Sequence, residues 1–73
     1  MTTVAITGDT FRFRAQISAA RDRLTRSAAY QWDAARKAWL RSYEGEVTEA
    51  RAISDIRSIS GIGNRGQFSA EII

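Results

Sequence analysis

The spacing of the apolar residues switches between two periods along this chain of 73 residues. β-Branched residues at 4–7 and alternating apolar or aromatic side chains at 30–43 and 67–73 predict strands, with the middle stretch folded back as a hairpin. Apolar residues at 13–24 and 48–59 instead recur every three to four positions, as on one face of a helix. The predicted order is strand, helix, strand, strand, helix, strand.

The first predicted strand, Val4–Thr7, runs into a turn at Gly8. The helix that follows is expected to extend for about three turns and to be basic on both flanks. Its apolar face is predicted from Phe13, Ile17, Ala20 and Leu24.

The aromatic middle stretch predicts a hairpin whose four-residue loop is Asp33–Arg36. In that register Trp32 lies opposite Lys37, and Tyr30 lies opposite Trp39. Six side chains then share one face of the hairpin: Tyr30, Trp32, Lys37, Trp39, Arg41 and Tyr43.

The second helix is predicted over Thr48–Ile59, with Thr48 as its N-cap. Arg51 and Asp55 are spaced to form an exposed ion pair along it. Gly61 is predicted to adopt the left-handed conformation that ends the helix. The final strand is expected to place three apolar residues on one face: Phe68, Ala70 and Ile72.

This order of elements is typical of a split βαβ unit. We therefore expect an α+β, ferredoxin-like βαββαβ fold, with a four-stranded antiparallel sheet and two helices on one face. A chain of this length has room for a single domain, 1–73.

The composition excludes several classes of site. The chain has no cysteine and no histidine, which rules out disulfides, thiolate zinc sites and any nucleophile paired with histidine. No apolar run is long enough to span a bilayer, and the first residues lack the pattern of a secretory signal. We expect a cytoplasmic protein that does not contact membranes.

Charge is unevenly distributed. Residues 1–41 hold eight basic and three acidic side chains, a net charge of +5, whereas residues 42–73 hold three basic and five acidic ones, a net charge of −2. Ten of the eleven basic residues are arginine, whose planar guanidinium suits phosphate and carboxylate groups. A phosphate-bearing or acidic partner is one interpretation, and a solvated surface without a ligand is the other.

The segment Gly61–Gly66 reads G-x-G-x-x-G. A dinucleotide site needs these glycines after a strand and before a helix, where free N–H groups meet the phosphates. Here they follow a helix, so we interpret the segment as a helix end and a flexible connection over 60–67. Asn64 and Arg65 are candidates to contact a partner from this loop.

The aromatic face of the hairpin is the strongest functional signal. Sheets of this topology often bind single-stranded nucleic acid by stacking bases on exposed rings beside cationic side chains. The competing interpretation is that these rings form the core, because a small chain cannot leave many of them in water. The candidate contacts are Trp32 and Trp39 for stacking, and Arg12, Arg14, Arg21, Arg36, Lys37 and Arg41 for phosphates.

Three carboxylates, Glu44, Glu46 and Glu49, lie close together in the sequence. They lack a regular metal-ligand spacing, and the electrostatics of a helix start accounts for them at least as well. We expect no catalytic residues, no metal and no cofactor, and therefore not an enzyme.

The segments at 6–11 and 32–39 resemble a family of small domains of unknown function found in phage- and plasmid-borne proteins. The resemblance rests on Ile6-Thr7-Gly8, the aromatic Phe11, and the pattern of Trp32-Asp33, Lys37 and Trp39. It implies a mobile genetic element, and with it the handling of nucleic acid or interference with host defence.

The sequence thus predicts a non-catalytic module that binds nucleic acid. The alternative is a small inhibitor or adaptor that binds an acidic protein surface, or adds a strand at a sheet edge. A homodimer formed through the same edge is a third possibility.

Overall fold

Two helices and four strands follow one another in the predicted order in the computed structural model, which describes all 73 residues. The elements are β1 (Thr2–Gly8), α1 (Arg14–Ala19), β2 (Gln31–Asp33), β3 (Ala38–Tyr43), α2 (Glu49–Arg57) and β4 (Phe68–Ile72).

The strands form one antiparallel sheet in the order β2-β3-β1-β4. The central strand β1 sets Val4 opposite Arg41 and Ile6 opposite Trp39 on β3, and Ile6 opposite Ala70 on β4. The predicted α+β class, with a four-stranded antiparallel sheet and two helices, is confirmed.

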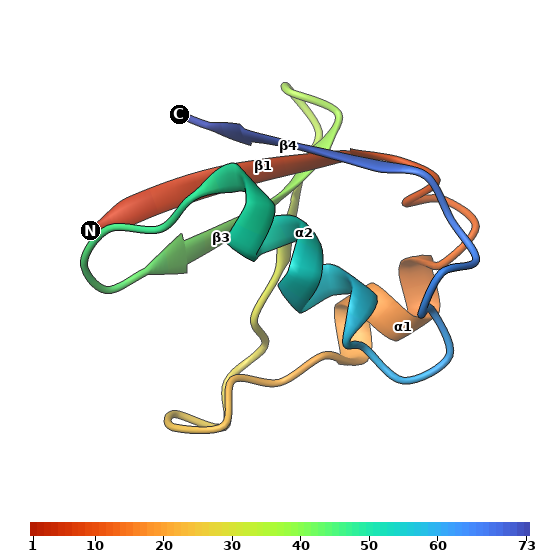
Figure 1. Ribbon diagram of the computed structural model, residues 1–73, viewed down its shortest axis with the longest axis horizontal. Helices are drawn as coiled ribbons and strands as arrows, with labels where there is room; N and C mark the ends of the chain where they lie inside the picture. The colour runs from red at the N-terminus through yellow and green to blue at the C-terminus, as the bar shows by residue number, and fades with distance from the viewer.

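Both helices contribute to the same core. Ile17 of α1 and Ala52 and Ile56 of α2 are buried in one cluster with Val4 and Ile6 of β1. Figure 1 shows both helices below β1 and β4, with α2 running across the sheet and α1 near one end of it. Residues three or four apart on a helix share a face, which is why the apolar pattern located these positions.

The first helix is shorter than predicted. It ends at Ala19, and the chain becomes extended at Ala20, with φ −62° and ψ 134°. Leu24, predicted to lie on the buried face, is 93% exposed. The prediction of about three turns is therefore wrong, because residues 20–29 form a separate projection, which we call the finger (Figure 1).

Local polar bonds account for this change. The backbone N–H of Ala29 donates to the carbonyl of Ala20 at 3.0 Å, which joins the two sides of the finger. The Asp22 carboxylate accepts from the backbone N–H groups of Leu24 at 2.8 Å and Thr25 at 3.3 Å. Such side-chain to backbone bonds compete with helix formation, and here they replace the next helical turn.

The hairpin register differs from the prediction by two residues. Trp32 lies opposite Trp39, not opposite Lys37, and Tyr30 precedes the paired residues. A shift of two residues keeps every side chain on its face, whereas a shift of one would reverse it. The aromatic residues therefore remain on the helix-facing side, and only Lys37 leaves the predicted set.

The loop between β2 and β3 is Ala34–Lys37, one residue later than predicted. The Asp33 carboxylate accepts from the backbone N–H groups of Ala35 at 3.0 Å and Arg36 at 3.3 Å, which sets the start of the turn. Lys37 adopts a left-handed φ of 54° at its end. Its side chain consequently belongs to the turn.

The second helix starts as predicted and ends early. The Thr48 hydroxyl accepts from the backbone N–H of Arg51 at 3.1 Å, which confirms the N-cap. The pair between Arg51 and Asp55 is also present, at 3.1 Å. The helix ends at Arg57, so the expectation that Gly61 ends it is wrong; Gly61, with φ 92°, lies in the turns that follow.

The last strand confirms its predicted face, since Phe68, Ala70 and Ile72 pair with residues of β1 on the core side. Gly8 makes this approach possible at the end of β1. Its φ is 107°, and an added Cβ would overlap the carbonyl oxygen of Gln67. No helix of the protein combines the length and apolar character needed to cross a membrane.

Candidate nucleic-acid interface and the adjoining cleft

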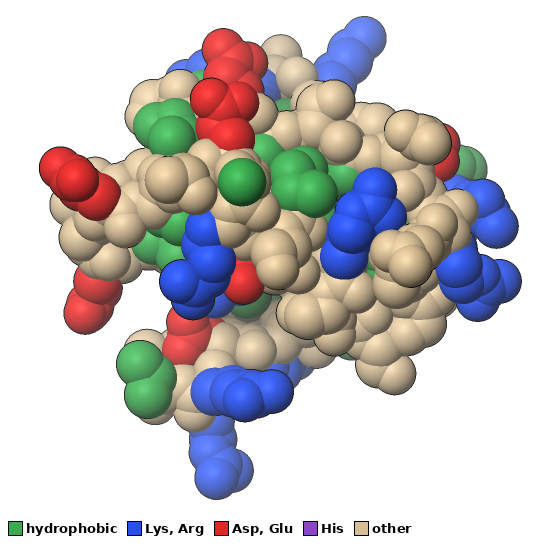
Figure 2. Space-filling view, viewed as in Figure 1, with side chains coloured by type: hydrophobic (Ala, Val, Ile, Leu, Met, Phe, Trp, Pro, Cys, Tyr) green, Lys and Arg blue, Asp and Glu red, His purple; other side chains and the backbone are tan.

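Most arginines of this protein lack a carboxylate partner. The ion pairs involve Arg36, Arg41 and Arg51. We call the basic side the surface formed by the remaining arginines: Arg12, Arg14, Arg21, Arg23, Arg26, Arg57 and Arg65. In Figure 2 blue side chains lie at the right edge and the bottom, where Figure 1 places α1, the connection from α2 to β4 and the finger, and others lie on the front and at the top.

Contacts between distant segments assemble this surface. The Arg12 guanidinium donates to the backbone carbonyl of Arg65 at 3.3 Å, so the start of α1 and the 60–67 connection meet. Arg14 donates to the carbonyl of Phe11 and lies 4.4 Å from the centre of its ring. Arg12, Arg14, Arg65 and the neighbouring Asn64 are all exposed. Two sets of residues predicted separately are thus neighbours.

The predicted stacking residues lie at the other end of the molecule. Trp32 is 50% exposed, and Trp39 is partly buried against the core. Their rings meet edge to face with centroids 5.6 Å apart. Arg36 and Lys37 are exposed in the adjoining turn, where Arg36 pairs with Asp33 at 3.3 Å. Figure 1 shows this turn at the top and the finger at the bottom.

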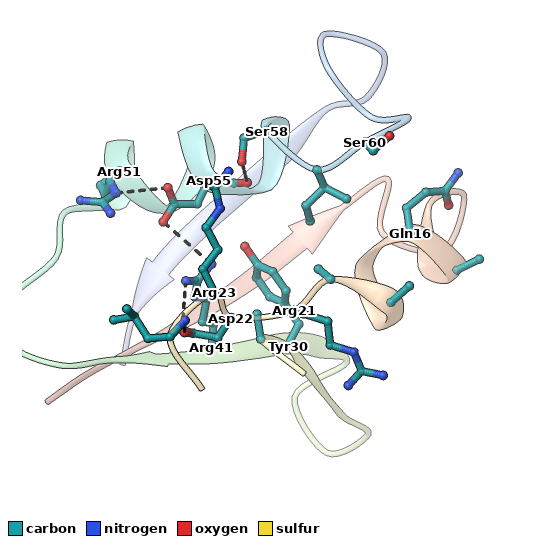
Figure 3. Close-up of a pocket in the computed structure, with 16 residues that line it drawn as sticks. Gln16, Arg21, Asp22, Arg23, Tyr30, Arg41, Arg51, Asp55, Ser58 and Ser60 are labelled. Atoms are coloured by element: carbon teal, nitrogen blue, oxygen red, sulfur yellow. Dashed lines mark hydrogen bonds and ion pairs between the residues drawn. The ribbon is translucent and has the colours of Figure 1, made fainter. Parts of the chain in front are cut away.

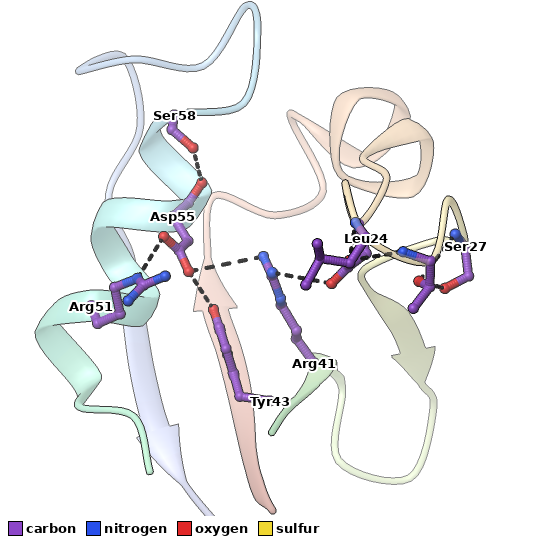
Figure 4. Close-up of polar contacts among 9 residues, drawn as sticks. Leu24, Ser27, Arg41, Tyr43, Arg51, Asp55 and Ser58 are labelled. Atoms are coloured by element: carbon purple, nitrogen blue, oxygen red, sulfur yellow. Dashed lines mark hydrogen bonds and ion pairs between the residues drawn. The ribbon is translucent and has the colours of Figure 1, made fainter. Parts of the chain in front are cut away.

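Arg41 occupies the interior of a polar cluster. Its guanidinium lies 3.8 Å from the carboxylate of Asp22 in the finger and 3.9 Å from that of Asp55 in α2. Its charge also faces two rings, 4.4 Å from the centre of Tyr43 and 5.5 Å from that of Tyr30. Figure 4 shows the side chain between α2 and the finger, so Arg41 connects elements of the fold.

The surroundings of this cluster shift several of its pKa values. Hydrogen bonds from the backbone N–H groups of Leu24 and Thr25 lower the pKa of Asp22. Burial raises the pKa of Tyr30, and the nearby Arg41 opposes that shift without reversing it. Burial and the hydrogen bond that its hydroxyl donates to Asp55, at 2.9 Å, raise the pKa of Tyr43.

Beside this cluster a cleft of about 840 Å³ opens between α1, the finger and α2. Figure 3 shows its polar lining, with the Tyr30 hydroxyl pointing into the space between the two helices. Arginines Arg21, Arg23 and Arg51 lie around it, and small apolar residues form much of its wall. These apolar wall residues are Ala15, Ala19, Ala20, Ala29 and Ile59.

The other candidate positions do not gather into a site of their own. Glu44, Glu46 and Glu49 are exposed at the connection from β3 to α2. No cluster of three or more acidic, histidine or cysteine side chains suited to a metal ion is present. The glycines of the 61–66 segment lie in turns that follow α2, as the order of elements predicted.

Sequence reasoning missed the cleft and its linking carboxylates. Asp55 and Tyr30 were predicted to lie in an exposed ion pair and on the hairpin face, and Asp22 received no role within the stretch 13–24 that was predicted to be helical. The signal for the finger is present in the segment 22–27, where Asp, Thr and Ser interrupt the helical pattern. The link through Arg41 requires the tertiary fold, because its partners lie on two different elements.

Comparison of this chain with protein-family models, with curated proteins and with solved structures finds no match.

Proposed function

We propose that this protein is a small non-catalytic module that binds nucleic acid through its basic side. Guanidinium groups without a carboxylate partner are available to phosphate oxygens, which they contact in pairs. The 60–67 connection contributes Arg65, with Asn64 as a neutral hydrogen-bonding neighbour.

The observation that carries the proposal is that three arginines pair with carboxylates and the other seven do not. Arg41 is held inside the fold by two carboxylates, and Arg36 and Arg51 each have one. The arginines of the basic side have none, and two of them from distant segments, Arg12 and Arg65, are in contact. Such a concentration of unneutralised positive charge destabilises the folded chain slightly, and it favours association with a polyanion.

We assign the smaller share of the nucleic-acid contacts to the turn between β2 and β3 and to Trp32 beside it. Trp32 is 50% exposed and can stack on a base, but Trp39, Tyr30 and Tyr43 belong to or border the core. A continuous aromatic platform of the kind that binds single strands needs more exposed rings. We assign the main contacts to Arg12, Arg14, Arg21 and Arg65, and a lesser contact to Trp32, Arg36 and Lys37.

Fluorescence anisotropy of a labelled single strand, measured over a series of salt concentrations, tests this proposal. Binding should weaken as salt rises, because each phosphate contact releases counterions and adds about 0.7 to the slope of log K against log salt. The double variant Arg14→Gln/Arg65→Gln should reduce that slope by about 1.4.

The matched control is Arg36→Gln/Lys37→Gln, which also removes two positive charges but lies at the hairpin turn. Equal losses in the two variants would mean that net charge alone drives binding. No binding of wild-type protein at low salt, or binding that is indifferent to salt, would exclude the proposal.

A second candidate is a protein-binding inhibitor or adaptor that uses the edge of β4. Only β1 pairs with β4, and Phe68–Ile72 contains a single charged residue, Glu71, and no lysine or proline. Such an edge offers free backbone groups to a partner strand. Recovery of one stoichiometric protein after nuclease treatment would favour it, and a solution mass twice that of the 8.1 kDa chain would indicate a homodimer.

Two finer assignments accompany this proposal. The strand order β2-β3-β1-β4, with antiparallel neighbours throughout, supports a ferredoxin-like arrangement of the βαββαβ elements. The pattern of Ile6-Thr7-Gly8, Trp32-Asp33 and Trp39 supports an origin in a phage or another mobile element, where small nucleic-acid-binding modules have a use.

A further inference from the structure

The hydroxyl of Tyr30 is an unpaired polar group in the interior. Tyr30 is 3% exposed, and its hydroxyl has no hydrogen-bond partner. An unpaired buried hydroxyl costs about 1–3 kcal/mol, and phenylalanine would fill the same space without that cost. The chain nevertheless carries tyrosine here, with its hydroxyl directed into the cleft (Figure 3).

The carboxylates beside the cleft have little capacity left to accept hydrogen bonds. One oxygen of Asp55 accepts from Arg51 at 3.1 Å and the other from Tyr43 at 2.9 Å. One oxygen of Asp22 is bonded to the backbone of the finger, and its other oxygen faces Arg41. The donors are in excess, because four arginines and two aspartates line the cleft.

The apolar wall adds a second requirement for a ligand. Four alanines on α1 and the finger give part of the lining small side chains, and Leu24 and Ile59 add larger apolar ones. A volume of about 840 Å³ falls in the range of small-molecule sites, which are about 300–1,000 Å³. The cleft therefore suits a ligand with one flat, largely apolar part and one anionic part.

We propose that this cleft binds one nucleotide unit. Its phosphate contacts Arg21 and Arg23 at the rim, its base lies along the alanine wall, and the Tyr30 hydroxyl bonds a polar atom of the base. This inference rests on the proposed function. The nucleotide is either free or part of a strand, and the same chemistry recognises both.

The decisive variant is Tyr30→Phe, which removes only the hydroxyl. Titration of wild-type and variant protein with adenosine monophosphate, and separately with a labelled deoxyadenosine strand, should show binding weakened by about tenfold in the variant. The melting temperature of the variant should equal or exceed that of wild type. A tyrosine that serves only to pack the core would give the same melting temperature but no loss of nucleotide binding, because its hydroxyl has no hydrogen-bond partner in the fold.

A second measurement does not depend on any variant. On addition of adenosine monophosphate to wild-type protein, amide resonances of Ala19, Ala29 and Ile59 should shift, and those of Glu46 on the far connection should not. Weakened binding of the strand alone, without binding of the free nucleotide, supports the cleft as a site for a nucleotide within a strand.

The inference is overturned if the strand binds Tyr30→Phe as tightly as wild type and shifts no amide of the cleft. That result leaves the basic side as the binding surface. Absence of any strand binding at low salt is distinguishable from it, because it removes the proposed function and this inference together.

Discussion

Replacement of Arg41 by glutamine should destabilise the fold strongly, although Arg41 was expected from the sequence to contact phosphate. At 3.8 and 3.9 Å, and with an effective dielectric constant of about 20, each of its two ion pairs has a Coulomb attraction of about 4 kcal/mol before desolvation is subtracted. Exposed pairs contribute a net 0–1 kcal/mol or so, and breaking buried pairs costs about 3–5 kcal/mol.

The side chain of Arg41 is 20% exposed and therefore lies between these cases, so the lost pairs should cost about 2 kcal/mol. Its cation–π contact with Tyr43 adds about 0.5–1 kcal/mol. The free energy of unfolding should fall by about 2–3 kcal/mol, out of roughly 4–11 kcal/mol for a chain of this length. The corresponding loss in melting temperature is about 10–20 °C.

Chemical denaturation followed by tryptophan fluorescence measures this change. The matched control is Arg51→Gln. Arg51 pairs with the same Asp55, but the side chain of Arg51 is 65% exposed, so its loss should cost about 0.5 kcal/mol or less. A double-mutant cycle of Arg41→Gln with Asp22→Asn should give a coupling energy of about 1 kcal/mol. The reasoning is refuted if Arg41→Gln costs no more than Arg51→Gln, since Arg41 would then be an ordinary surface arginine.

Three further predictions follow from backbone geometry and titration. Gly8→Ala should lower the free energy of unfolding by more than about 3 kcal/mol, because a Cβ there overlaps the Gln67 carbonyl and the φ is 107°. The control Gly45→Ala, at φ 74° in open space, should cost about 1–2 kcal/mol. Thermal melts compare the two variants. The chain has two tyrosines, both with raised pKa, so absorbance near the tyrosinate band should stay flat through the ordinary pKa of 10. Folding favours the neutral forms of both tyrosines. This contribution to the free energy of unfolding is complete below pH 10 and is lost as the pH rises towards the raised pKa values. Formation of tyrosinate in the folded protein at pH 10 would contradict this prediction. Because folding lowers the pKa of Asp22, its ionised carboxylate stabilises the fold at pH values above the ordinary pKa of 3.8. This stabilisation is lost as the pH falls through the lowered pKa. The amide signals of Leu24 and Thr25 should therefore keep their positions until the pH is below 3.8.

The order of elements was predictable because it depends on local periodicity. Residues such as Ile17, Ala52 and Ile56 occupy the buried face of a helix in any fold that uses that helix, so their pattern located them correctly. Thr48 was identified as an N-cap for a similar reason, since its bond to Arg51 spans only three residues.

The finger and the hairpin register were not predictable in the same way. Leu24 continues the helical spacing of Phe13 and Ile17, and only the competing bonds of Asp22 show that the helix has ended. The predicted and observed registers differ by two residues and bury the same faces of the hairpin, so the sequence pattern does not distinguish them. The observed register is the one that brings Trp32 against Trp39. Tertiary contacts decide between such alternatives.

The arginines of the candidate site can be counted in the sequence, but which of them pair with a carboxylate cannot be predicted from it. The excess of arginine predicts an anionic partner, but the composition cannot separate Arg41, which pairs with two carboxylates, from Arg12 and Arg14, which pair with none. That distinction requires the distances to Asp22 and Asp55, which lie in different parts of the sequence.

Amide chemical-shift mapping during titration with a single-stranded oligonucleotide tests the central claim most directly. If the basic side binds the strand, the largest shifts fall within residues 12–26 and 57–65, and they shrink as salt is added. Shifts concentrated at Trp32–Lys37, or along β4 from Phe68 to Ile72, would contradict it, because the contact surface would then be the hairpin turn or the sheet edge and not the unpaired arginines.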